Sequence, residues 1–122
     1  MVRRDLLAAV VLMCLVLMVT PTESAGLPPV ADFSGTPTSG VAPLIVLFTD
    51  NSTNDPLEWN WDFGDGSSEN ATVQNPVHTF FSSGTYTISL NATNDAGSST
   101  STRDNYILVS DAQTGPIPIT GP

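Results

Sequence analysis

The sequence predicts an all-β fold, a Greek-key β-sandwich of about seven strands, from three observations. Trp59, Trp61 and Phe63 alternate with polar residues, which is the two-residue period of a half-buried strand. The Gly-Asp-Gly sequence at 64–66 follows at once and is a strong signal for a tight hairpin turn. Turn residues recur along residues 30–111 at the spacing of short strands, with no convincing helical period.

Residues 1–25 are typical of a secretory signal peptide. Arg3 and Arg4 form a basic start, an apolar run covers residues 6–19, and small polar residues follow. The run is shorter than the roughly 20 residues that a membrane span needs. An uncleaved N-terminal anchor is the alternative. We therefore expect a secreted or cell-surface protein with no membrane insertion after signal cleavage.

Turn and loop residues divide the rest of the chain into short segments. Residues 26–29 form a leader into a domain that we expect at 30–111. The predicted strands are 30–34, 44–50, 58–63, 72–73, 77–80, 86–93 and 99–109. We expect a loop at 36–40, a hairpin turn at 94–97 and a bulge near Asp104. Residues 112–122 are rich in Pro and Gly, which suits a tail or linker rather than a sheet interior.

Alternation also predicts which side chains form the core. In the strand at 86–93, Tyr86, Ile88, Leu90 and Ala92 share the inward face. The core is expected to centre on Trp61, with these neighbours: Phe33, Val46, Phe48 and Phe63. The Tyr86 hydroxyl is expected to bond to nearby backbone, as in a tyrosine corner. Since Cys14 is the only cysteine, the core must stabilise the exported domain without a disulfide.

The charge excludes one class of partner. The chain has a net charge of −9, and Arg103 is the only basic residue after residue 25. Such a surface repels phosphate backbones, so we expect no nucleic-acid binding.

Four motifs together resemble the PKD (polycystic kidney disease) domain family. They are WNWDFGDG at 59–66, NPVHTF at 75–80, GTYTISLNATNDAGSS at 84–99 and DNYILV at 104–109. The version resembled is found in archaeal and bacterial surface-layer and secreted proteins, and the resemblance covers about residues 28–111. It implies an Ig-like β-sandwich without catalytic activity. It also implies structural roles for Trp61, Asp62, Phe63, Gly64, Asp65, Gly66, His78 and Tyr86.

Two features of the sequence are candidates for a chemical site. Asp50, Asn54, Asp55 and Glu58, together with Asn51, place oxygen ligands that calcium favours around one loop, without the D-x-D-x-D-G spacing. A solvated loop is the alternative, and we expect no other cofactor.

His78 is the single histidine, so any Ser-His-Asp triad must use it. No G-x-S-x-G elbow accompanies it. We expect no enzyme activity. We expect the ring of His78 to donate a hydrogen bond to the backbone.

Surface candidates are of two kinds. Asn51, Asn70 and Asn91 each begin an N-x-S/T sequon and are glycosylation candidates. Ile45 and Leu47 are apolar on the outward side of their strand, where the family usually has Thr or similar, and form a candidate docking patch. Trp59 is a candidate for stacking on a sugar ring. Ile45, Leu47 and Trp59 are thus the interaction candidates.

The sequence leaves two hypotheses for function. The first is a non-catalytic extracellular interaction or spacer module that contacts a cell-envelope protein or polysaccharide. The second is an accessory substrate-binding domain of a larger secreted hydrolase, present here as a fragment. An exposed Trp59 would favour the second hypothesis. The sequence predicts no oligomeric state.

Overall fold

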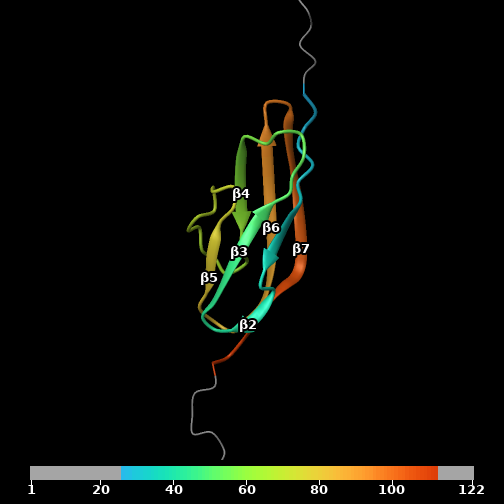
Figure 1. Cartoon of the computed structure of the whole chain (residues 1–122). Coiled ribbons are helices and arrows are strands. Elements are labelled where there is room, and N and C mark those ends of the chain that lie inside the picture. Colours follow the sequence, from blue (N-terminus) through green and yellow to red (C-terminus); the bar gives the residue numbers. More distant parts are fainter. Residues whose placement is uncertain (1–25, 113–122) are drawn as a thin grey trace, which may run out of the picture.

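The computed structural model describes residues 26–112, which form two β-sheets packed face to face around one core (Figure 1). The predicted signal peptide at 1–25 and most of the predicted tail, residues 113–122, lie outside the described residues. Within the described range, no helix is long and apolar enough to cross a membrane. The all-β prediction is confirmed, with seven strands.

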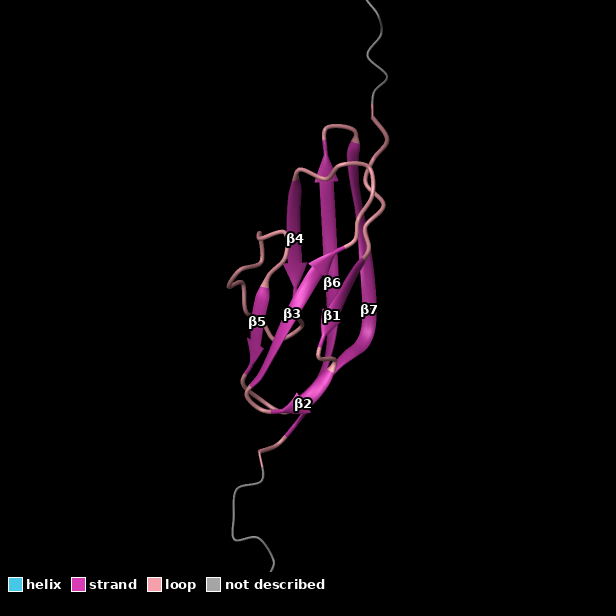
Figure 2. Cartoon of the chain, in the orientation of Figure 1, coloured by secondary structure: helices cyan, strands magenta, loops and turns pink. Residues whose placement is uncertain are grey.

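The first sheet has three antiparallel strands in the order β1-β3-β5 (Figure 2). Their bounds are β1 Phe33–Thr36, β3 Leu44–Asp50 and β5 Val77–Phe80. Alternation along β3 buries Leu44, Val46 and Phe48, because successive side chains point to opposite faces. Ile45 and Leu47 therefore point outward, as expected, and are 56% and 53% exposed.

The second sheet has four strands in the order β2-β7-β6-β4. Their bounds are β2 Ser39–Val41, β4 Glu58–Asp62, β6 Gly84–Asn94 and β7 Gly97–Ser110. The β6–β7 hairpin and the β4–β6 pair are antiparallel, whereas β2 runs parallel to β7. The chain thus begins in one sheet with β1 and changes to the other at β2.

Aromatic rings from both sheets form the centre of the core. Trp61 is 3% exposed, and its ring centroid lies 5.3 Å from that of Phe33 and 5.5 Å from that of Phe48. Phe63 lies 5.3 Å from Phe48 and closes the cluster. Aromatic pairs in this distance range add stability beyond the apolar area that they bury. The predicted core around Trp61 is confirmed.

The long strand β6 follows its predicted pattern. Ile88, Leu90 and Ala92 are fully buried, and Tyr86 packs at the edge of the core. The Tyr86 hydroxyl donates a 2.7 Å hydrogen bond to the carbonyl oxygen of Ser82, four residues earlier.

The structure corrects three details of the sequence prediction. Residues 72–73 form a turn instead of an edge strand. The strand Ser39–Val41, which begins inside the predicted loop at 36–40, pairs with β7. The turn at 64–66 does not close a hairpin, because β4 and β5 belong to different sheets. Residues 63–76 cross between the sheets, and the local turn signal could not reveal where the next strand pairs. The bulge near Asp104 is confirmed by the register shift opposite Thr87.

Side chains of β7 cover the free edge of β1. The Tyr106 hydroxyl accepts a 3.0 Å hydrogen bond from the Gly35 amide, which lies on that edge. Nearby, the Arg103 guanidinium donates to the Asp32 carboxylate at 3.0 Å. Unpaired strand edges are sites of unwanted pairing, so these contacts protect the sheet. Within the described residues, 26–112, the two sheets share one core.

Candidate functional site

The crossover at 63–76 is built by the residues of the WDFGDG motif. Oδ1 of Asp62 accepts a 2.8 Å hydrogen bond from the Gly64 amide, and Oδ1 of Asp65 accepts one of 3.0 Å from the Ser67 amide. Gly64 has a φ of +76°, and a Cβ there would lie 2.5 Å from the Thr87 carbonyl oxygen. Short Asp side chains stabilise such turns by accepting from backbone two residues on.

His78 is held by a carboxylate instead of the backbone that we expected. Its Nε2 lies 2.7 Å from Oδ2 of Asp65, and the ring is 5% exposed. The ring stacks on Phe63 at a centroid distance of 4.0 Å and meets Phe80 edge-on. Among residues 26–112 no serine hydroxyl bonds to this ring, so the Asp-His pair lacks the nucleophile of a hydrolase triad.

Asp50, one of the calcium candidates, uses its carboxylate to bind three donors of the domain itself. Oδ2 accepts from Trp59 Nε1 at 2.7 Å and from Gln74 Nε2 at 3.2 Å, and Oδ1 accepts from the Ser52 amide at 2.9 Å. Partial burial acts to raise the pKa of Asp50, but the hydrogen bonds from these donors outweigh it and lower the pKa.

The remaining calcium candidates lie elsewhere around the same end of the sandwich. Asn54 and Asp55 line one surface hollow, and Glu58 borders a smaller one beside it. No group of three or more His, Cys, Asp or Glu side chains in the described range is arranged to hold a metal ion. A calcium site stays a prediction, and the structure does not bring its proposed ligands together in one cluster.

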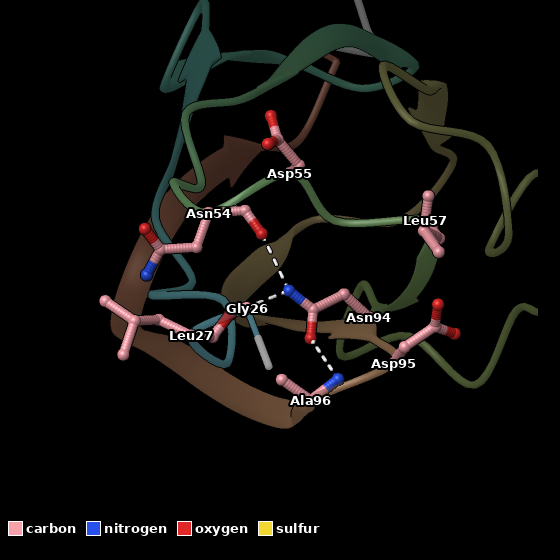
Figure 3. Close-up of a pocket in the computed structure, with 8 residues that line it drawn as sticks. All are labelled: Gly26, Leu27, Asn54, Asp55, Leu57, Asn94, Asp95 and Ala96. Atoms are coloured by element: carbon pink, nitrogen blue, oxygen red, sulfur yellow. Dashed lines mark hydrogen bonds between the residues drawn. The ribbon is translucent and has the colours of Figure 1, made fainter. Parts of the chain in front are cut away.

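The hollow at this end is held together by Asn94, as Figure 3 shows. Its Nδ2 donates to the carbonyl oxygens of Leu27 at 2.9 Å and Asn54 at 2.7 Å, and its Oδ1 accepts from the Ala96 amide. The space has a volume of about 400 Å³ and is open to solvent. Because Asn94 joins the leader, the β3–β4 loop and the β6–β7 turn, it fixes the shape of the hollow.

Trp59 lies at the rim of the core. The ring is half-buried against the core, and its N–H is bonded to Asp50. A sugar could reach only the part of the ring that remains exposed, so the stacking role predicted for Trp59 stays a prediction.

The outward side chains of the three-stranded sheet carry no charge, and we call them the uncharged face. They are Ser34, Thr36, Ile45, Leu47, Thr49, Val77 and Thr79. Leu47 stands directly opposite Val77 in the β3–β5 register, and Ile45 stands opposite Thr79. Sequence reasoning missed Val77, which is 47% exposed, because its place beside Leu47 depends on strand pairing. The outward face of the other sheet carries Glu58 and Asp62 at its β4 edge.

Two of the three sequons border the uncharged face. Asn51 Nδ2 donates to Ser34 Oγ at 3.2 Å, and Asn70 Nδ2 donates to the Val77 carbonyl at 3.1 Å. Asn91 lies on the opposite sheet, where its Nδ2 donates to Thr100 Oγ1. Glycosylation of these residues stays a prediction.

Several solved structures are similar to this chain. One, described as the structural basis for promiscuous specificity of carbohydrate-binding modules from the β-sandwich superfamily, has 30% identity and a TM-score of 0.63. The similarity covers 71% of this chain but only 36% of that one. The PKD1 domain of Vibrio anguillarum Epp has 28% identity and a TM-score of 0.57, covering 70% of this chain and 99% of that domain. The PKD1 domain of the Vibrio cholerae metalloprotease PrtV has 28% identity and a TM-score of 0.53, covering 63% and 93%.

A family model of the PKD domain matches residues 27–109, which is almost the whole of the described sandwich. The similar solved PKD domains agree with this match. The chain belongs to the PKD domain family, whose members are generally non-catalytic modules.

Proposed function

We propose that this PKD domain binds a secreted or cell-surface protein to a cell-envelope protein or polysaccharide, with the uncharged face as the contact surface. One observation carries the proposal. Ile45, Leu47 and Val77 form an exposed aliphatic group on a sheet face without charge, in a chain whose net charge is −9. Exposed aliphatic groups of this kind on an otherwise polar surface mark interaction sites.

The size of the aliphatic group sets the strength of the contact. Fully burying a Val, Leu or Ile side chain contributes about 1.5–3 kcal/mol, and these three are already about half buried. Their complete burial would therefore contribute roughly 3–4 kcal/mol, before the cost of association is subtracted. A single domain would bind weakly, which suits a module that acts in several copies or beside other contacts.

The inventory of polar groups supports a role without catalysis. His78 is buried and paired with Asp65, and Asp50 is occupied by three donors. His78 and Asp65 line a surface hollow of about 320 Å³ together with Ser67, but within residues 26–112 the His78 ring makes one hydrogen bond, to Asp65.

Cosedimentation tests the proposal. Residues 26–122 are mixed with cell envelopes of the source organism and, separately, with insoluble chitin, cellulose or collagen, each with and without EDTA. The double variant Ile45→Thr/Leu47→Thr removes the aliphatic pair but keeps β-branched residues on β3. Val41→Thr/Leu108→Thr is the matched control, because both residues are exposed to a similar extent on the other sheet.

We expect the wild-type domain and the control to pellet with envelopes, and the Ile45/Leu47 variant to remain in solution. Equal pelleting of all three folded proteins would refute the assignment of the uncharged face. Binding that EDTA abolishes would support a calcium site in the loop around residues 50–58.

An accessory substrate-binding domain of a larger secreted hydrolase is the second candidate function. Two similarities favour this candidate. One is to the PKD1 domain of a metalloprotease, and the other is to a structure whose description names carbohydrate-binding modules. The hollow beside Asn94 has the exposed residues Leu27 and Leu57 on its wall and is the surface that we assign to this role. Pelleting with one polymer, abolished by Leu57→Ser and retained by the Ile45/Leu47 variant, would support this candidate over the first.

A further inference from the structure

We infer that the free edge of β5 binds an extended segment of a partner protein that carries an arginine. The inference goes beyond the proposed function, because a sheet edge offers backbone groups, whereas the uncharged face offers side chains. β5 is the last strand of the three-stranded sheet and has a neighbour, β3, on one side only. A strand edge of this kind can pair with a strand from another chain.

The register between β3 and β5 shows which backbone groups point to the free edge. The Phe48 amide donates to the Pro76 carbonyl oxygen at 2.9 Å, so these two residues form a hydrogen-bonded pair of the antiparallel ladder. Such pairs alternate with pairs whose N–H and C=O groups point away from the partner strand. Val77, opposite Leu47, and Thr79, opposite Ile45, therefore point their backbone groups to the free edge.

The crossover covers this edge at Val77 but not at Thr79. The Asn70 side-chain amide donates to the Val77 carbonyl oxygen at 3.1 Å, which agrees with the outward direction of that carbonyl and occupies it. The crossover also covers the edge of β4, where the Ala71 carbonyl oxygen accepts from the Trp61 amide at 2.8 Å. Within residues 26–112, the Thr79 N–H and carbonyl oxygen have no such partner. Both groups can therefore pair with an incoming backbone.

The hollow of about 320 Å³ that His78 lines extends along this part of the edge, between β5 and the crossover. We call it the edge hollow, and its volume is near the lower end of that of ligand sites. Thr79 and Phe81 belong to its β5 side, and Glu69 belongs to its crossover side. Phe81 is 78% exposed, the highest value among the large apolar side chains of the described range. The edge hollow thus combines unpaired backbone with an accessible aromatic ring.

The free polar groups of the edge hollow are mainly acceptors. Asn70 Nδ2 is bonded to the Val77 carbonyl, and His78 Nε2 is bonded to the Asp65 carboxylate. In the described part of the chain, no donor bonds to the Glu69 carboxylate, which leaves a charged acceptor beside Phe81. A guanidinium group has five donors and no acceptor, and its plane stacks on aromatic rings. This combination selects arginine over a sugar, whose hydroxyl groups both donate and accept.

The charge of the domain favours a basic partner and excludes a second copy. Residues 1–25 hold two of the three basic residues and two of the twelve acidic ones, so ten acidic side chains remain with Arg103 alone. A surface with this balance attracts basic segments and speeds their encounter with it. Arg103 already pairs with Asp32 at 3.0 Å, and a second copy would have to break that pair to supply the arginine.

Titration followed by NMR tests the inference on ¹⁵N-labelled residues 26–122, which hold both sheets and their shared core. The probe is the peptide acetyl-Thr-Val-Arg-Val-Thr-amide, whose β-branched residues favour an extended strand. We expect saturable shifts of the Val77 and Thr79 amide signals at roughly millimolar peptide, because few groups take part in the contact. Hydrogen exchange of the Thr79 amide should become about five-fold slower at saturation.

Matched peptides separate the backbone contact from the arginine contact. The peptide with glutamine in place of arginine should bind about ten-fold more weakly, because it lacks the charge. N-methylation of alternate residues removes N–H donors but keeps every side chain. Since alternate N–H groups of an added strand face the edge, one of the two possible methylated peptides should bind about five-fold more weakly and the other should bind like the parent.

Domain variants locate the contact. Glu69→Gln should weaken binding of the arginine peptide about ten-fold, and Phe81→Ser about three-fold. Glu58→Gln makes the same charge change on the exposed side of β4 and should leave binding unchanged. Circular dichroism shows whether each variant is folded.

Absence of binding at about 5 mM peptide would overturn the inference, as would equal binding of all four peptides or equal effects of Glu69→Gln and Glu58→Gln. Shifts of the same amides with a cellulose or chitin oligosaccharide, but not with the peptide, would also refute it in favour of a sugar. The cosedimentation test is independent of this result. If the peptide does not bind but Ile45→Thr/Leu47→Thr abolishes pelleting with envelopes, the edge assignment fails and the uncharged face stands. The reverse result would keep the edge and refute the face.

Discussion

Asp50→Asn should destabilise the domain although it changes only one atom of the side chain. The Asp50 carboxylate accepts from the Ser52 amide on one oxygen and from Trp59 and Gln74 on the other. Asn offers one acceptor oxygen and one NH₂ donor. If its oxygen faces Ser52, the NH₂ group meets the Trp59 indole N–H, and the flipped amide places NH₂ against the Ser52 amide. Each orientation opposes a donor to a donor.

The loss follows from the strength of these bonds. Hydrogen bonds to a charged acceptor contribute about 1.5–3 kcal/mol, and the exposed Gln74 side chain can turn to water at little cost. We therefore expect Asp50→Asn to lower the free energy of unfolding by about 2 kcal/mol at pH 7. For a domain of this size, that corresponds to a fall in Tm of roughly 8–16 °C. Urea unfolding followed by circular dichroism measures the difference.

The difference should also depend on pH. Because its hydrogen bonds hold the pKa of Asp50 below the ordinary value, the carboxylate contributes its full stability above a pH of about 4. That contribution is lost as the pH falls through the folded-state pKa, where wild type gains a proton and resembles the variant. Asp95→Asn makes the same charge change at the exposed β6–β7 turn and should cost less than about 0.5 kcal/mol. A loss for Asp50→Asn as small as in this control, or equal at pH 7 and pH 2.5, would refute the reasoning.

Three further predictions concern the turn at Gly64, the Tyr106 hydroxyl and calcium. Gly64→Ala should lower the free energy of unfolding by more than about 2 kcal/mol, because the new Cβ would meet the Thr87 carbonyl oxygen. Gly66 has a similar φ but open space around it, so Gly66→Ala should cost about 1 kcal/mol. Equal losses in urea unfolding would contradict this. Tyr106→Phe should cost about 1 kcal/mol by removing the acceptor of the Gly35 amide while keeping the ring, and an unchanged Tm would show that water replaces the hydroxyl. Addition of 5 mM CaCl₂ should shift Tm by less than about 1 °C, and a rise of several degrees would reveal a bound ion.

Local patterns were sufficient to predict much of the fold. Alternation along β3, β4 and β6 identified the inward side chains correctly, since each strand has one face on the core. A bulge near Asp104 was also predicted, and the register of β7 against β6 shifts there. These features depend only on residues that are neighbours in the sequence.

Pairing between distant segments was not predictable in the same way. Ser39 and Gly40 of β2 have little β propensity, and their strand exists because β7 offers a free edge. The partner of His78 is thirteen residues earlier in a turn, so its sequence neighbours gave no signal for it. The candidate surface was predicted in part, through Ile45 and Leu47, while Val77 required the register between β3 and β5.

The parallel pairing of β2 with β7 has a mechanical consequence. The described chain enters at one end of the sandwich and leaves at the other, as Figure 1 shows. Tension on the two ends pulls β2 and β7 in opposite directions along their length, so their backbone bonds, including Ala42 N–H to the Ser110 carbonyl, carry the load in shear. Bonds loaded in this way must break together rather than one after another. The rate of forced unfolding would then depend on this short strand pair, while the rest of the core remained unstretched until it failed.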